Sequence, residues 1–149
     1  MNDAKTALGH KIVAIKKKHK WTWPEIAAKL EHAPVWTCAA CLGQMSMLPE
    51  TAAKAADLFG LDAAETALLQ AIPYRGSLPG GVPTDPLIYR FYELVMVYGT
   101  TWKELIQEEF GDGIMSAIDF DMTMERQPDQ KGDRVKLAMT GKFLAYKRY

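Results

Sequence analysis

The sequence predicts an α+β protein made of two parts, and three observations support this fold class. Apolar residues recur at helical spacing, between capping signals, through residues 1–72. Residues 73–83 are rich in proline and glycine and are typical of a linker. Beyond residue 118 apolar and polar residues alternate, as in half-buried strands. We therefore predict an N-terminal five-helix bundle over residues 1–76 and a small helix-plus-β-hairpin domain over residues 77–149.

The helices of the N-terminal half are marked by local start and stop signals. Thr22 and Glu25 form a capping box, in which a hydroxyl and a carboxylate satisfy the first free N–H groups of a helix. Asp62 and Glu65 repeat that pattern. The five expected helices span residues 3–19, 22–30, 35–42, 49–60 and 62–72. The tight turn between the second and third makes the bundle resemble a helix-turn-helix domain.

A helix-turn-helix bundle raises the hypothesis of DNA binding, which the side chains do not favour. The would-be recognition helix, PVWTCAACLG at Pro34–Gly43, has no charged or amide side chain to read base edges. Lysines cluster at residues 16–20, which we interpret as a solvated helix end. The net charge is zero, with 18 basic and 18 acidic residues. We expect no nucleic-acid partner, and a transcriptional regulator with an anion-sensing dimerisation domain stays as the alternative.

The composition also bears on location and on metals. No apolar run approaches the roughly 18 residues of a membrane span, and the first twenty residues lack a signal-peptide pattern. We therefore expect a cytoplasmic protein with no membrane partner. Cys38 and Cys41 have C-x-x-C spacing, but a zinc site needs about four ligands and only His32 is near. Both cysteines fall inside an expected helix, so we interpret them as plain buried thiols and expect no metal site.

The C-terminal half is expected to begin with a helix over residues 85–98, DPLIYRFYELVMVY. Asp85 is a natural N-cap and Gly99 a natural stop, and a capping box at Thr101 and Glu104 then predicts a second helix to Phe110. The first helix is apolar nearly all round, which is typical of a buried helix. Because a chain of 149 residues has little core to surround it, we expect burial against other subunits.

A β-hairpin is expected after the break at Gly111–Gly113. Apolar residues alternate with polar ones from Ile118 to Glu125, and a polar loop at 127–133 leads to a second alternating run from Val135. A hairpin of two strands is marginal in water. We therefore predict that a partner chain adds strands to form an intersubunit sheet.

Arg90 and Glu93 stand one helical turn apart in the apolar segment. An arginine keeps its proton, so a buried one needs an anion nearby. Either Glu93 simply pairs with it and fixes how subunits dock, or Glu93 orients the guanidinium so that its free N–H groups bind a small anion. Ser116, after the glycine break, is either a turn serine or a hydroxyl donor aimed at such an anion.

The segment of residues 83–120 resembles the cyanase (cyanate hydratase) family. The matching motifs are YRFYE at Tyr89–Glu93, YGTT at Tyr98–Thr101 and FGDGIMSAI at Phe110–Ile118, and GKFL at Gly141–Leu144 also fits. The helical first half is compatible with the family but adds little specificity.

This resemblance implies an enzyme, a carbon–nitrogen lyase that decomposes cyanate to ammonia and carbon dioxide with bicarbonate as co-substrate, through carbamate. It implies that Arg90, Glu93 and Ser116 are the catalytic residues and that residues 77–149 form the dimerisation and catalytic domain. It further implies cyanate and bicarbonate as small-anion partners, no metal or organic cofactor, and a homodecamer of five dimers with active sites at subunit interfaces. A role in cyanate detoxification and nitrogen metabolism follows from that activity.

Overall fold

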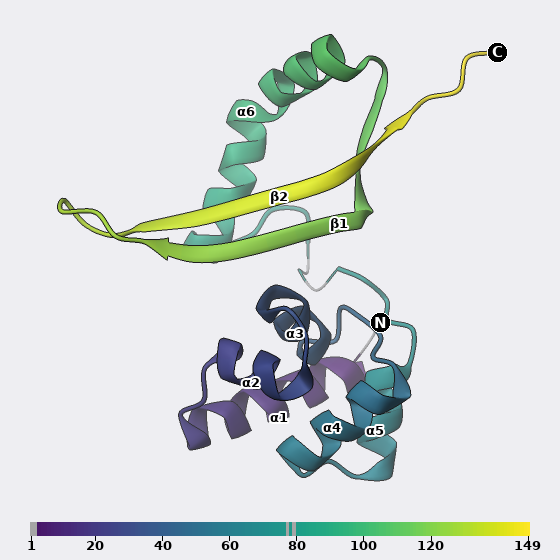
Figure 1. The fold of residues 1–149 in the computed structure, drawn as a ribbon, viewed down its shortest axis with the longest axis vertical. Helices are drawn as coiled ribbons and strands as arrows, with labels where there is room; N and C mark the ends of the chain where they lie inside the picture. The colour runs from purple at the N-terminus through teal and green to yellow at the C-terminus, as the bar shows by residue number, and fades with distance from the viewer. Residues whose placement is uncertain (1–2, 77, 79) are drawn as a thin grey trace. The chain divides into compact units, whose positions relative to one another are not determined.

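The computed structural model describes residues 3–76, 78 and 80–149. The chain divides into two compact units, Met1–Ser77 and Leu78–Tyr149. In the described part of the first unit the regular elements are all helices, and the second unit joins one helix to a two-stranded antiparallel sheet (Figure 1). The predicted α+β fold class is therefore confirmed.

The five predicted helices of the first unit are all present. Thr22 accepts a hydrogen bond from the Glu25 N–H, and the Glu25 carboxylate accepts one from the Thr22 N–H. Asp62 and Glu65 make the same reciprocal pair. The helices are α1 Asp3–His19, α2 Trp23–Leu30, α3 Pro34–Cys41, α4 Pro49–Phe59 and α5 Ala63–Gln70. Helix α1 has the predicted bounds, and the ends of the other four lie within two residues of the predicted ones.

The first unit has a hydrophobic core of its own. Its largest fully buried side chains come from α1, α2 and α3: Ile12, Ile26, Leu30, Thr37 and Cys41. Helices α4 and α5 close the core with Ala52, Ala55, Phe59 and Leu69. Burying each large aliphatic side chain stabilises the fold by about 1.5–3 kcal/mol, so this unit does not depend on the second one for its hydrophobic driving force.

The second unit begins with one long helix, α6 Pro86–Phe110, where the sequence predicted two. The predicted cap is correct: the Asp85 carboxylate accepts from the N–H groups of Leu87 and Ile88, both at 2.9 Å. The predicted stop at Gly99 is wrong: a glycine stop commonly requires a positive φ, whereas Gly99 keeps a helical backbone. A helical glycine costs only about 1 kcal/mol relative to alanine, which continued hydrogen bonding offsets. The helix ends at Gly111, with φ of +90°.

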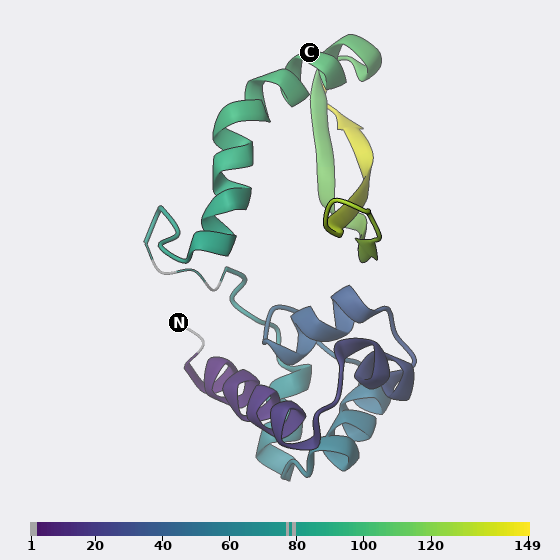
Figure 2. The ribbon, with the colours of Figure 1, turned by 90° about the vertical axis from the view of Figure 1, so that its left-hand side faces the viewer.

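Helix α6 buries none of its residues within the chain. It rises along one side of the unit and arches over at its C-terminal end to meet β1 (Figure 2). Its exposed apolar side chains include Leu87, Leu94, Val95, Val97 and Leu105. The chain's own atoms therefore do not supply the burial that the apolar sequence predicts. Burial against other subunits stays a prediction.

The hairpin pairs β1 Gly113–Gln127 with β2 Arg134–Ala145. The first strand begins five residues before the predicted start at Ile118, because Gly113, Ile114 and Met115 already pair with the end of β2. The register then breaks. Met115 faces Phe143 and Phe120 faces Gly141, so the four residues between them on β1 face Lys142 alone. The pattern of the sequence did not predict this bulge, and the intersubunit sheet stays a prediction.

Candidate active site

Arg90 lies in the second turn of α6 and is held by its own helix. Its Nη1 lies 3.1 Å from Glu93 Oε2, and its Nε donates to the Pro86 carbonyl oxygen at 3.3 Å. Its guanidinium carbon is 5.2 Å from the centre of the Tyr89 ring, a cation–π contact. The predicted Arg90–Glu93 pair is therefore present, and it fixes one side of the guanidinium.

The other side of the Arg90 guanidinium has free donors. No hydrogen bond to Nη2 is made by any residue that the structure describes. The side chain is 61% exposed and that of Glu93 is 46% exposed. The predicted shielding from solvent is thus not provided by this chain. What the chain provides is a planar cation, oriented by one carboxylate, with an edge available for a second anion.

Ser116 lies within β1, at the start of the β-bulge. It is only 4% exposed. Its Oγ accepts hydrogen bonds from the N–H groups of Ile118 and Asp119, both at 3.0 Å. Among the described residues no acceptor takes the hydroxyl hydrogen, so that O–H can donate to a bound anion. Acceptance from the N–H groups two and three residues on is also the bonding of a turn serine, so the donor role of Ser116 stays a prediction.

The chain brings together two of the three predicted site residues. Arg90 and Glu93 touch, whereas within the described ranges no hydrogen bond or ion pair links either of them to Ser116. Arg90 and Glu93 are therefore paired within one chain, and a site shared between chains stays a prediction. Sequence spacing revealed the first pair, since residues three apart share a helix face, but it carries no information on the third residue.

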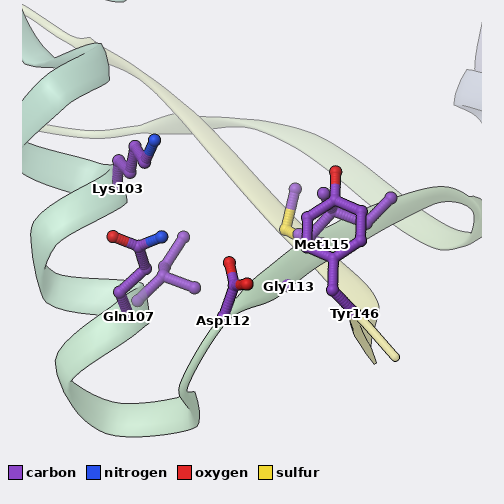
Figure 3. Close-up of a pocket in the computed structure, with 8 residues that line it drawn as sticks. Lys103, Gln107, Asp112, Gly113, Met115 and Tyr146 are labelled. Carbon is purple, nitrogen blue, oxygen red and sulfur yellow. The ribbon is translucent and has the colours of Figure 1, made fainter. Parts of the chain in front are cut away.

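A pocket of about 350 Å³ lies where α6 meets the start of β1 (Figure 3). Residues from the end of α6, from the turn and from the two ends of the hairpin line it: Lys103, Ile106, Gln107, Asp112, Gly113, Ile114, Met115 and Tyr146. The Tyr146 N–H donates to the Asp112 carbonyl oxygen at 3.0 Å and ties the end of β2 to this turn. None of the three predicted residues lines the pocket, and the sequence analysis did not predict it.

The C-x-x-C pair lies in α3, away from Arg90 and Ser116 in the sequence. Cys41 is buried and Cys38 half-buried. Burial raises the pKa of both thiols above the usual value, that of Cys41 to about 12. Thiols with raised pKa values are poor nucleophiles and poor metal ligands. In the described part of the chain no three His, Cys, Asp or Glu residues are grouped to hold a metal ion, and no described helix is long and apolar enough to span a bilayer.

Comparison with protein families gives two matches that together cover most of the chain. Residues 5–73 match the cyanate hydratase N-terminal domain, and residues 80–148 match the cyanate lyase C-terminal domain. A cyanate hydratase of Methylibium petroleiphilum is 60% identical over 139 residues, which are 93% of this chain and 95% of that protein. One of Dechloromonas aromatica is 59% identical over 93% of this chain and 94% of its own.

A solved structure agrees with the sequence comparisons. The crystal structure of cyanase from T. urticae matches with a TM-score of 0.78 and 36% identity, covering 93% of this chain and 96% of that one. The two domain matches and this fold define an enzyme of the lyase class. The chain belongs to the cyanate hydratase family. The resemblance seen in the motifs around Arg90 and Ser116 is thereby confirmed.

Proposed function

We propose that this enzyme decomposes cyanate with bicarbonate to ammonia and carbon dioxide, through carbamate, at sites formed between subunits. The observation that carries the proposal is the environment of Arg90. Its guanidinium is oriented by Glu93, keeps a free edge, and sits on a helix with no residue buried in its own chain. Family membership supports cyanate as the substrate.

The chemistry requires two anions to be held side by side. Cyanate and bicarbonate repel each other, so joining them needs positive charge and hydrogen-bond donors that fix both at reacting distance. Arg90, from more than one subunit, supplies the charge, and the free O–H of Ser116 supplies a neutral donor. Glu93 orients Arg90 and takes part in proton handling. Preorganised donors of this kind lower a barrier without a covalent enzyme intermediate.

The proposed steps balance as follows. A bicarbonate oxygen attacks the cyanate carbon, and the nitrogen takes up the bicarbonate proton and one solvent proton. The mixed anhydride that results breaks its C–O bond, releasing carbon dioxide and leaving carbamate. Carbamate takes a second solvent proton on nitrogen and breaks its C–N bond, giving ammonia and a second carbon dioxide. No redox change occurs, so the steps need no redox cofactor. We propose that Arg90 and Ser116 supply the charge and the donors, and that no metal or organic cofactor takes part.

The site proposal includes an assembly. A neighbouring copy covers the exposed faces of α6 and adds strands to the hairpin, and we propose a decamer of five dimers, with the enzyme acting in the cytoplasm. Nucleic acid is not a proposed partner: in α3 the one side chain with a hydroxyl, Thr37, is fully buried. The regulator alternative therefore has no feature of α3 to support it.

The test is ammonia release from cyanate by the purified protein, with and without bicarbonate. We expect release to depend on both anions. Oxalate, a small dianion that mimics the two substrates held together, should compete with them. Turnover at an undiminished rate without bicarbonate, or under saturating oxalate, would contradict the two-anion site. Salt-sensitive, sequence-specific binding of duplex DNA without cyanate turnover would support the regulator alternative.

A further inference from the structure

The bulge in β1 determines where the Ser116 side chain points. Side chains alternate between the two faces of a strand, and extra residues on one strand shift that alternation. Here four residues of β1 face Lys142 alone. Ser116 is buried, with 4% of its surface exposed, whereas Ile118, two residues further along the strand, is 98% exposed. The hydroxyl then closes the bulge by accepting from the N–H groups of Ile118 and Asp119.

Gly141 faces this bulge from the opposite strand. A Cβ atom added to Gly141 would lie closer to the Ser116 carbonyl oxygen than unbonded atoms approach, and 2.6 Å from Met115 Cγ. The φ angle of Gly141 is not in the left-handed region, so its backbone conformation does not require glycine. What requires glycine at this position is room for the backbone of Ser116.

We propose that Gly141 is a positioning residue for Ser116: the missing side chain lets the Ser116 carbonyl approach β2, which forms the bulge and aims the hydroxyl. The catalytic consequence rests on the proposed function, in which Ser116 donates to a bound anion. The geometric part, that Gly141 fixes the bulge, stands apart from any activity. Gly141 itself need not touch substrate.

A double-mutant cycle separates positioning from a general structural role. Ser116→Ala should lower kcat/KM by about 100-fold, as for loss of one donor to a developing anion. In the wild-type background, Gly141→Ala should lower kcat/KM by about 10- to 100-fold. In the Ser116→Ala background it should lower kcat/KM by less than about threefold, because the effects of two residues that act as a unit are not additive. Equal losses in both backgrounds would overturn the proposal.

Gly113 offers a matched control. A Cβ there would clash as severely, but with the Leu144 carbonyl oxygen and the Phe143 ring. Gly113→Ala should therefore keep its full effect in the Ser116→Ala background. If Gly113→Ala is as strongly coupled to Ser116 as Gly141→Ala is, general loosening of the hairpin explains both results and the proposal fails.

Hydrogen exchange followed by mass spectrometry gives a readout that needs no activity. The amides of Ile118 and Asp119 should exchange at least as fast in Gly141→Ala as in Ser116→Ala, while those of residues 122–126 stay protected. Unchanged exchange at Ile118 and Asp119 would overturn the proposal even if turnover fell. Absence of cyanate turnover in the wild type would instead reject the proposed function and leave the exchange result to decide on Gly141.

The variant Met115→Ala/Gly141→Ala guards against misfolding. It removes the clash with the Met115 side chain and keeps the one with the Ser116 carbonyl. If Gly141→Ala yields no folded protein, kcat/KM and hydrogen exchange are measured on this double variant instead. It should match the expected behaviour of Gly141→Ala. Wild-type exchange and turnover in it would show that Gly141 accommodates Met115 and not Ser116, which would overturn the proposal.

Discussion

The geometry of a single side chain determines what Arg90 can bind. One edge of its guanidinium is held by Glu93 and by the Pro86 carbonyl oxygen, so the plane of the remaining N–H groups is fixed before any ligand arrives. A lysine at this position would keep the charge but would lose both the planar fork and the second anchor to the helix. The proposed function therefore depends on arginine and not merely on a cation.

Arg90→Lys should lower kcat/KM for cyanate by about 100-fold or more, a loss typical of removing a preorganised donor to a developing anion. Ammonia release at varied cyanate and bicarbonate measures it. Arg126→Lys is the matched control, since Arg126 is also exposed and pairs with a carboxylate, Asp133, at 2.9 Å. We expect the control to retain near wild-type turnover. Near-normal turnover of Arg90→Lys would reject the role assigned to Arg90.

At the scale of the element, the capping boxes of α2 and α5 each place a glutamate carboxylate at the start of a helix. The stability of that start therefore depends on whether the glutamate is ionised. The hydrogen bond from Lys11 and that from the Asp62 N–H lower the pKa of Glu65 below its usual 4.5. A carboxyl whose pKa is lowered by folding stabilises the folded state above its unfolded pKa, and that contribution is lost as the pH falls through the folded value. The start of α5 should therefore weaken in acid.

Glu65→Gln tests this linkage, because glutamine still accepts from the Asp62 N–H but does not titrate. The difference in unfolding free energy between wild type and Glu65→Gln should be largest near pH 7. It should shrink as the pH falls below 4.5, where Glu65 takes up a proton in the unfolded chain before it does so in the folded one. Tryptophan fluorescence in a Trp102→Phe background reports the first unit alone, since the other three tryptophans lie there. Glu50→Gln, in the first turn of α4 without a capping box, is the control. A difference independent of pH would contradict the linkage.

The elements that the sequence predicted well are those set by neighbours along the chain. Both capping boxes and the Arg90–Glu93 pair join residues three apart, so their spacing is visible in the sequence. Gly99 was misinterpreted because a glycine stop depends on its backbone angle, which the residue type alone does not determine. The bulge at Ser116 depends on Gly141, 25 positions later, so no local pattern predicts it. The catalytic roles rest on resemblance and stay predictions.

At the scale of the whole molecule, the two units differ in how they are stabilised. The first encloses a core of buried side chains, whereas the long helix of the second buries none within its chain. A helix and a two-stranded hairpin with exposed apolar faces have little to hold them folded alone in water. The second unit should therefore fold only with other copies, and its stability should depend on protein concentration.

Dilution should unfold the second unit and leave the first unit folded. Where sedimentation shows single chains, amides in α6 and the hairpin should exchange at unprotected rates while those in α1–α5 stay protected. Comparing hydrogen exchange across a dilution series measures this directly. Protection of α6 in a population of single chains would contradict it, and so would loss of protection in the first unit at the same concentration.

Mixed assemblies test whether the site is shared between chains. Arg90→Lys and Ser116→Ala should each be nearly inactive alone, but their co-assembly should regain activity, because a shared site takes Arg90 from one variant and Ser116 from the other. Each variant refolded by itself under the same conditions is the control. No recovery in mixed assemblies of confirmed composition would indicate that Arg90 and Ser116 act from the same chain.

The order of the two units along the chain has a consequence for biosynthesis. A protein made from its N-terminus presents α1–α5 at the ribosome exit first, and these helices complete their core while α6 is still being translated. The exposed apolar surface of α6 emerges later, when the first unit has already folded. The interval in which it is open to aggregation, and in which a chaperone would be useful, then lasts only until another newly made copy arrives.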